Sequence, residues 1–300
     1  MGKAEELFPD GNIPAVCVSI TGRTKEEILR QAEEAARCDA DMAEWRADFC
    51  DGIFGGDDVY IGMEKGLLSD LKERLGGKTL LFTVRTKKEG GNADIDENAY
   101  KTAVENALDP GLADLVDIEY SAGAELVEEL AGLAKEAGVV SILSSHDFDK
   151  TPDDTELKKR VAAMDKTGTD MIKIAVMANC EEDVERIYRL SEKMKAGATS
   201  GNKVESAGER KNGLVKKPYI LISMGELGRR TRFDAEKLGS ALTFGALEGN
   251  QGSASASGAL PENQGPALDI GALEENRASA PGQPSVSELK AEIVKRHRTR

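Results

Sequence analysis

The stretch GVVSILSSHDFDKTPDDTELKKRVAAMDKTGTDMIKIAV, residues 138–176, contains two short apolar runs separated by a longer amphipathic segment. The runs at 138–145 and 170–176 are rich in valine, isoleucine and leucine, which is typical of buried strands. The segment between them, 151–165, opens with Thr-Pro. This pair predicts a helix with threonine at its N-cap and proline at its first position. The order strand, helix, strand predicts two parallel strands joined by a crossover helix.

The same unit recurs along the whole chain of 300 residues. Six further strands are predicted at 14–20, 41–48, 78–85, 114–120, 218–224 and 239–244, and three further helices at 24–38, 181–195 and 285–297. The helix at 24–38 opens with Thr24 and has Glu27 three residues on, which is the spacing of a capping box. Eight such units predict an α/β fold of the (β/α)₈ TIM-barrel type, forming a single domain over residues 1–300. A doubly wound open sheet is the structural alternative, although no G-x-G-x-x-G follows the first strand to favour it.

Two segments interrupt this pattern. Residues 197–217 are rich in Gly, Ser, Lys and Asn, which predicts a mobile surface insertion. Residues 245–283 contain three consecutive copies of a 13-residue repeat, GALEGNQGSASAS, GALPENQGPALDI and GALEENRASAPGQ. We interpret the repeat as a duplication that lengthens one loop; a partner-binding loop is the alternative. Only the third copy continues into the predicted helix at 285–297.

The bulk composition excludes several classes of function. A net charge of −14 makes nucleic acids and anionic membranes unfavourable partners. No stretch approaches the roughly 20 apolar residues that span a bilayer, and the acidic start of the chain does not resemble a signal peptide. Cys17, Cys38, Cys50 and Cys180 form no C-x-x-C pair, so we expect free thiols in a reducing cytoplasm. Two histidines are too few for most zinc sites, so no metal is expected.

Lys173 is the most informative single residue, because a lysine inside an apolar strand is costly unless it is paired or has a lowered pKa. The active sites of TIM barrels lie at the carboxyl ends of the strands. Burial there, near Arg46, Arg85 or Arg232, would leave the amine neutral enough to attack a carbonyl. The same three arginines suit the bidentate binding of a carboxylate. The alternative is an outward-pointing Lys173 whose amine reaches water between helix and sheet.

Other polar residues are expected at the same edge of the barrel. His146 follows the fifth strand and is suited to proton transfer near neutral pH, unless it is a satisfied structural histidine. Glu89 follows the third strand and either orients His146 or lies solvated in a loop. Glu44 and Arg46 alternate along the second strand and therefore share a face. They either contact substrate hydroxyls or form a structural ion pair.

Six segments resemble type I 3-dehydroquinate dehydratases. They are EWRAD (44–48), LLFTVRTKKEGG (80–91), SSHDFDKTP (144–152), DMIKIAVMA (170–178), LGSALTFGA (238–246) and SAPGQPSVSEL (279–289). The segments keep the order of the family and cover most of the chain. The resemblance implies a (β/α)₈ homodimer that converts 3-dehydroquinate to 3-dehydroshikimate in the shikimate pathway. It also implies a lysine Schiff base with no metal or organic cofactor.

The resemblance assigns a role to individual residues. Lys173 matches the imine-forming lysine, His146 the general acid/base and Glu89 the glutamate that positions this histidine. Arg232 matches the arginine that binds the substrate carboxylate. The other residues implied to bind substrate are Ser19, Glu44, Arg46 and Arg85, with Ser279 and Gln283 in the lid loop.

The chain also departs from the family pattern. Its short N-terminus predicts that the hairpin that often closes the barrel bottom is missing or reduced. The repeat is expected to slow closure of the lid or to loosen it. Two other functions stay open at this point. A class I aldolase also carries a Schiff-base lysine on its sixth strand, but no phosphate-binding glycine loop is evident here. A catalytically inactive scaffold is disfavoured, because Lys173, His146, Glu89 and Arg232 are all present.

Overall fold

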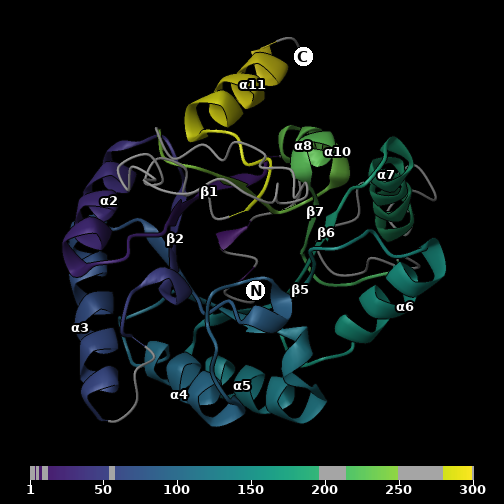
Figure 1. The fold of residues 1–300 in the computed structure, drawn as a ribbon. Coiled ribbons are helices and arrows are strands. Elements are labelled where there is room, and N and C mark those ends of the chain that lie inside the picture. The colour runs from purple at the N-terminus through teal and green to yellow at the C-terminus, as the bar shows by residue number, and fades with distance from the viewer. Residues whose placement is uncertain are drawn as a thin grey trace, which may run out of the picture.

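The barrel is visible in a computed structural model that describes residues 4, 7–8, 13–53, 58–195, 214–248 and 280–298. Its parallel strands are β1 (Ala15–Ile20), β2 (Met42–Arg46), β3 (Thr79–Thr83), β4 (Leu115–Glu119), β5 (Val140–Asp147), β6 (Met171–Met177), β7 (Tyr219–Met224) and β8 (Leu242–Gly245). They follow the order β7-β6-β5-β4-β3-β2-β1-β8. Between the two end strands, the Ala241 N–H donates to the Tyr219 carbonyl at 2.9 Å, which brings the ring close to closure (Figure 1). The predicted TIM barrel is therefore confirmed.

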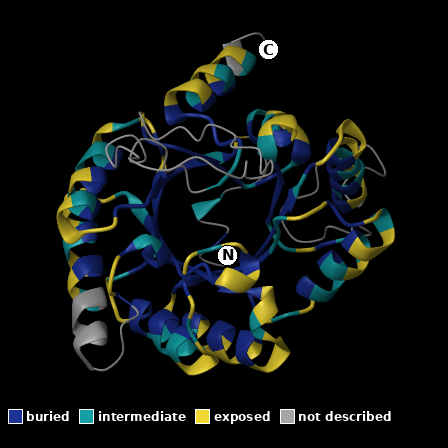
Figure 2. Cartoon of the chain, in the orientation of Figure 1, coloured by how far each residue is buried: buried dark blue, intermediate teal, exposed yellow. Residues whose placement is uncertain are grey.

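A ring of helices surrounds the strands (Figure 1). The long helices are α2 (Lys25–Arg37), α3 (Asp58–Arg74), α4 (Glu97–Ala107), α5 (Ala124–Ala137), α6 (Asp154–Met164), α7 (Glu181–Lys195) and α11 (Val286–Arg298). The short ones are η1 (Ala47–Phe49), η2 (Lys87–Glu89), η3 (Tyr120–Ala122), α8 (Gly225–Gly228), α9 (Arg230–Phe233) and α10 (Ala235–Leu238). Figure 2 shows buried residues on the strands and on the inner faces of the helices, with exposed residues outside. In α2, the buried Ile28, Ala32 and Ala35 recur at helical spacing.

Side chains cap the starts of α2, α4 and α6, and one of two predicted caps is correct. The hydroxyl of Thr24 accepts a hydrogen bond from Glu27 N at the start of α2, as predicted. The predicted Thr-Pro start of α6 is wrong, because Asp153 is the N-cap and accepts from two backbone N–H groups. A carboxylate here also meets the positive end of the helix dipole. The hydroxyl of Thr151 donates to the carbonyl of Met177 instead, 2.7 Å away.

On β4 and β6 the inward side chains change from apolar to polar along the strand. On β4 the alternation runs from Leu115 through Asp117 to Glu119, all buried, and on β6 the apolar Met171 precedes Lys173. The apolar cluster inside the barrel also includes Ala4, Leu7 and Phe8. These residues before β1 therefore contribute apolar side chains to the barrel interior.

The two interrupting segments lie largely outside the described residues. Of the predicted insertion 197–217, only 214–217 are described, and the rest lies outside the described residues. Val215 is buried, and Lys217 Nζ donates to the Thr167 carbonyl at 2.7 Å. Most of the repeat, 249–279, lies outside the described residues. None of the described helices is long and apolar enough to cross a membrane. All four cysteines are free thiols, as predicted.

Candidate active site

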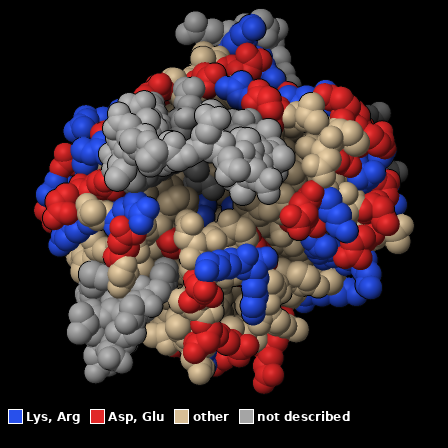
Figure 3. All heavy atoms as spheres, in the orientation of Figure 1, with Lys and Arg blue, Asp and Glu red and all other residues tan. Residues whose placement is uncertain are grey.

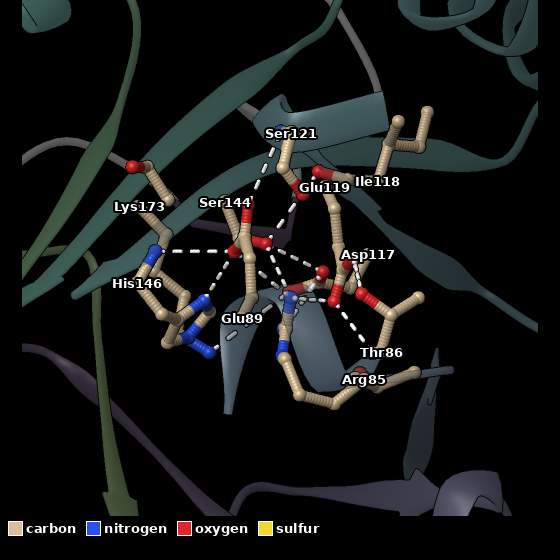
Figure 4. A network of polar contacts seen from close by, with 12 residues as sticks. Arg85, Thr86, Glu89, Asp117, Ile118, Glu119, Ser121, Ser144, His146 and Lys173 are labelled. Atoms are coloured by element: carbon tan, nitrogen blue, oxygen red, sulfur yellow. Dashed lines mark hydrogen bonds and ion pairs between the residues drawn. The ribbon is translucent and has the colours of Figure 1, made fainter. Parts of the chain in front are cut away.

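The polar residues of the barrel mouth are aligned by strand register. Glu119 pairs with Ser144, and Ser144 pairs with Lys173, so these three side chains occupy one level of the barrel. His146 lies two residues further along β5, which extends beyond its predicted end and carries this histidine within the strand. Because alternate residues face the interior, Lys173 and His146 point into the same opening. Figure 4 shows how their side chains approach one another.

Lys173 faces the barrel interior and is buried, which excludes an outward-pointing side chain. Its Nζ lies 3.9 Å from Asp117 Oδ2 and 4.3 Å from the centre of the Phe244 ring. Burial lowers the pKa of the amine from its usual value. The nearby carboxylates of Asp117 and Glu44 oppose this shift without cancelling it. The amine therefore loses its proton more easily than an exposed lysine does, as a nucleophile requires.

His146 is held by Glu89 through two contacts. Its Nδ1 lies 2.8 Å from Glu89 Oε2, and the same oxygen accepts from the His146 backbone N–H at 3.1 Å. The other oxygen of Glu89 accepts from Ser121 N. Since both oxygens already accept from fixed backbone donors, the ionised carboxylate suits the site and Nδ1 is the atom that donates. This assigns the proton of the neutral ring to Nδ1 and leaves Nε2 as the base.

The environment shifts this pair in opposite directions. Burial, followed by the charges of Arg85 and Lys173, holds the pKa of His146 well below its usual value. Burial raises the pKa of Glu89 to about 7, although Arg85 opposes the shift. Near neutral pH the imidazole is therefore uncharged, as a general base must be.

Arg85 is surrounded by protein carboxylates. Its Nη2 lies 2.8 Å from Asp117, and its Nη1 lies 3.0 Å from Glu119, 3.5 Å from Glu89 and 2.9 Å from the hydroxyl of Ser144. Burial alone would lower the pKa of Arg85, but these carboxylates raise it well above its usual value. Arg85 reaches the cavity wall, yet its guanidinium mainly organises the acidic residues beneath it.

The remaining predicted residues on β1 and β2 are also at the mouth. Glu44 accepts hydrogen bonds from Ser19 Oγ at 2.8 Å and from Thr83 Oγ1 at 2.9 Å. Arg46 forms a two-point ion pair with Asp48, at 2.7 and 2.8 Å. Glu44 and Arg46 both line the cavity, so each is available to a ligand there.

Arg232, on α9, differs from the other arginines at the mouth. It is buried, and its Nε has no hydrogen-bond partner within the described part of the chain. Burial lowers its pKa to about 10, with Glu44 opposing the shift. It therefore stays cationic at neutral pH without a carboxylate partner among the described residues. Such a group is suited to an anionic ligand.

These side chains line one cavity at the carboxyl ends of the strands. Its lining residues are Glu44, Arg46, Arg85, His146, Phe148, Lys173, Ala175, Ile222, Met224, Arg232, Phe244 and Ala280. The visible surface around the mouth mixes acidic and basic side chains (Figure 3). Inside the cavity, basic side chains are contributed by Arg46, Arg85, Lys173 and Arg232.

The described residues that lead into α11 lie against this cavity at one point. Ala280 lines it, and the Gly225 N–H donates to the Pro281 carbonyl at 3.3 Å. Gln283 follows three residues later in the chain; it is buried but is not among the residues that line the cavity. Ser279 lies outside the described residues.

Sequence reasoning missed several members of the site. Asp117 is the most important, and its signal was present, because alternation along LVDIE (115–119) places it on the same face as Glu119. Phe244 and the apolar residues of β7 were missed because no polar group marked them.

A buried lysine and an uncharged histidine sharing a cavity at the mouth of a β/α barrel define an enzyme of the barrel class. The family model for type I 3-dehydroquinase matches residues 16–296. The chain therefore belongs to the type I 3-dehydroquinase family, and its activity is that of a hydro-lyase.

Individual relatives agree with this assignment. The chain is 33% identical to the 3-dehydroquinate dehydratase of Syntrophotalea carbinolica over 81% of its own length and 88% of the relative's. It is also 33% identical to the Bacillus subtilis enzyme, over 94% and 91% of the two chains. A crystal structure of the Clostridium difficile type I enzyme with covalently modified comenic acid superposes with a TM-score of 0.76. That match has 30% identity and covers 98% of this chain and 95% of the other.

Proposed function

We propose that the chain eliminates water from 3-dehydroquinate to give 3-dehydroshikimate, through a Schiff base on Lys173, as a step of the shikimate pathway. The observation that carries this proposal is the buried amine of Lys173 in the same cavity as the Nε2 base of His146. The family membership and the relatives' names support the substrate.

The first half of the reaction uses Lys173. Its neutral amine attacks the ketone carbon and a C–N bond forms. The carbonyl oxygen then leaves as water with one proton from the nitrogen and one proton from solvent, so the nitrogen keeps one hydrogen and a positive charge. The resulting iminium draws electrons from the adjacent C–H bond and so makes that proton more acidic. The lowered pKa of Lys173 favours this attack.

The second half uses His146. Its Nε2 takes the acidified proton, and the C–H electrons form an enamine. The imidazolium then returns a proton to the β-hydroxyl, the C–O bond breaks and water leaves, which re-forms the iminium. Glu89 holds Nδ1 at 2.8 Å and stabilises the charged ring between the two transfers. Hydrolysis finally releases the product and the free amine.

The same cavity supplies groups that bind the rest of the substrate. Arg232 pairs with the carboxylate, since it is a buried cation with no carboxylate partner among the described residues. Glu44, Arg46 and Ser19 contact the ring hydroxyls, and Ser279 and Gln283 close over the substrate. Arg85 acts in this arrangement mainly by fixing the acidic residues beneath the ring.

Two linked measurements test the proposal. The first follows the absorbance of the conjugated enone formed from 3-dehydroquinate. The second reduces the mixture with borohydride and locates the adduct by mass spectrometry. We expect the adduct on Lys173 and its loss in Lys173→Ala. Lys217→Ala is the matched control, because Lys217 is a partly buried lysine outside the cavity.

The rival activity is tested in the same way. Trapping with sugar phosphates, but not with 3-dehydroquinate, would replace the dehydratase by an aldolase. An adduct that persists in Lys173→Ala would remove the imine assignment.

The proposal extends to the context of the enzyme. We infer one domain over residues 1–300, a homodimer in the cytoplasm, and a reaction that needs neither metal nor organic cofactor. Light scattering tests the dimer, and full activity in the presence of a chelator tests the independence from metal.

A further inference from the structure

The two oxygens of Asp117 have different surroundings, although the side chain is fully buried. Oδ1 accepts from Ser144 Oγ at 2.6 Å and pairs with Arg85 Nη2 at 2.8 Å. Oδ2 is buried without a hydrogen-bond partner among the described residues, and it lies 3.9 Å from Lys173 Nζ (Figure 4). A buried carboxylate oxygen without a donor is costly, so its position calls for a function.

The surroundings of Lys173 Nζ are suited to a positive charge. On one side lies Asp117 Oδ2, and on the other lies the face of the Phe244 ring, 4.3 Å away. An anion and an aromatic face both stabilise a cation, and neither supplies a hydrogen-bond donor to a neutral amine.

The charge balance of imine formation requires such surroundings. A lysine ammonium and a ketone give an iminium and water, and the two protons that nitrogen loses leave with the oxygen. The positive charge therefore stays on Nζ, while its N–H groups fall from three to one. A buried cation of this kind needs a counter-charge and a single acceptor.

Asp117 is suited to this role better than the neighbouring carboxylates. The oxygens of Glu119 already accept from Arg85 and from the backbone and hydroxyl of Thr86. Those of Glu44 accept from Ser19 and Thr83. Among the carboxylates that the structure describes at the mouth, Asp117 has a buried oxygen that accepts no hydrogen bond and faces Lys173 Nζ.

We propose that Asp117 is the counter-ion of the Schiff base, with Oδ2 accepting the one N–H of the Lys173 iminium while Arg85 and Ser144 hold Oδ1. This inference rests on the proposed imine mechanism. It assigns Asp117 to the stability of the intermediate rather than to substrate binding.

The test compares Asp117→Asn with Glu119→Gln. Both changes remove one carboxylate charge beside Arg85 without changing shape, but only the first removes the oxygen facing Nζ. The enzyme is incubated with 3-dehydroquinate at a series of pH values, reduced with borohydride, and the labelled fraction is measured by mass spectrometry. Melting temperatures show whether each variant is folded.

At pH 8 we expect the labelled fraction of Asp117→Asn to fall about tenfold. This fall corresponds to lowering the pKa of the iminium by about one unit. Its pH profile should move to lower pH, while Glu119→Gln keeps the profile of the unmodified chain. Equal profiles for Asp117→Asn and the unmodified chain would overturn the counter-ion role. No labelling of the unmodified chain would instead remove the imine mechanism itself.

A measurement on the unmodified chain covers the case in which Asp117→Asn does not fold. With ¹⁵N at the lysine side chains and 3-dehydroquinate bound, we expect the Schiff-base nitrogen to remain protonated at pH 8. An unprotonated imine at that pH would contradict a paired counter-ion.

Discussion

The Nδ1 atom of His146 lies 2.8 Å from Oε2 of Glu89, and the backbone N–H of the same histidine donates to the same oxygen. Glu89 thereby fixes both the ring orientation and the tautomer of its partner. Burial makes the histidine harder to protonate and the glutamate easier to protonate. As the pH falls, the carboxylate therefore gains a proton before the imidazole does.

Replacing Glu89 tests this relationship directly. In Glu89→Gln the amide NH₂ can face Nδ1, which favours the tautomer with the proton on Nε2 and removes the base. We expect kcat to fall by about 10- to 100-fold, which is a fraction of the rate enhancement that general acid–base catalysis usually supplies. Borohydride labelling of Lys173 should persist. An unchanged kcat would show that the tautomer is fixed by other means.

The pH dependence of kcat follows from the same pair. At saturating substrate Lys173 is already an imine, so the acid side of the profile reports His146 and Glu89. Because the pKa of Glu89 is raised to about 7, lowering the pH through 7 protonates this carboxylate, and kcat should fall. In Glu89→Gln the fall should move to lower pH, where the imidazole itself gains a proton. A variant with the same acid limb would assign that limb to another group.

We predict that Arg232 lowers the stability of the folded chain and strengthens substrate binding. A buried cation with no carboxylate partner among the described residues costs folding free energy. We therefore expect Arg232→Met to raise the melting temperature without ligand while KM rises about 100-fold or more, the value of a lost charge-assisted pair. Thermal shifts with and without 3-dehydroshikimate measure both effects. A lower melting temperature without ligand would mean that Arg232 has a structural partner.

Much of the fold was predictable because the strands are short, mostly apolar runs between longer amphipathic segments, and strand ends locate a barrel active site. The orientation of Lys173 was not predictable. In MIKIAVM (171–177) both faces of the strand are buried, so no alternation distinguishes inside from outside. Its neighbours Asp117 and Phe244 come from β4 and β8, and only closure of the barrel brings them together. The cap of α6 was mispredicted because Thr151 and Asp153 are both good caps, and tertiary contact with Met177 decides between them.

The close approach of Gly282 to Gly225 can be used to test whether the packing of residues 280–283 affects turnover. Gly282 has a φ of 70°, and a Cβ there would lie 2.3 Å from the carbonyl oxygen of Gly225. Gly282→Ala should therefore push residues 280–283 away from Gly225 and displace Ala280 from the cavity wall. We expect kcat/KM to fall about tenfold, because the cavity would lose the part of its wall that Ala280 forms and would admit more water. Gly111→Ala is the matched control, since Gly111 has a φ of 82° and open space around its Cβ position. It should lose about 1 kcal/mol of stability from backbone strain alone and keep its kcat/KM. Equal kcat/KM in the two variants would show that contact between Gly225 and Gly282 does not limit the reaction.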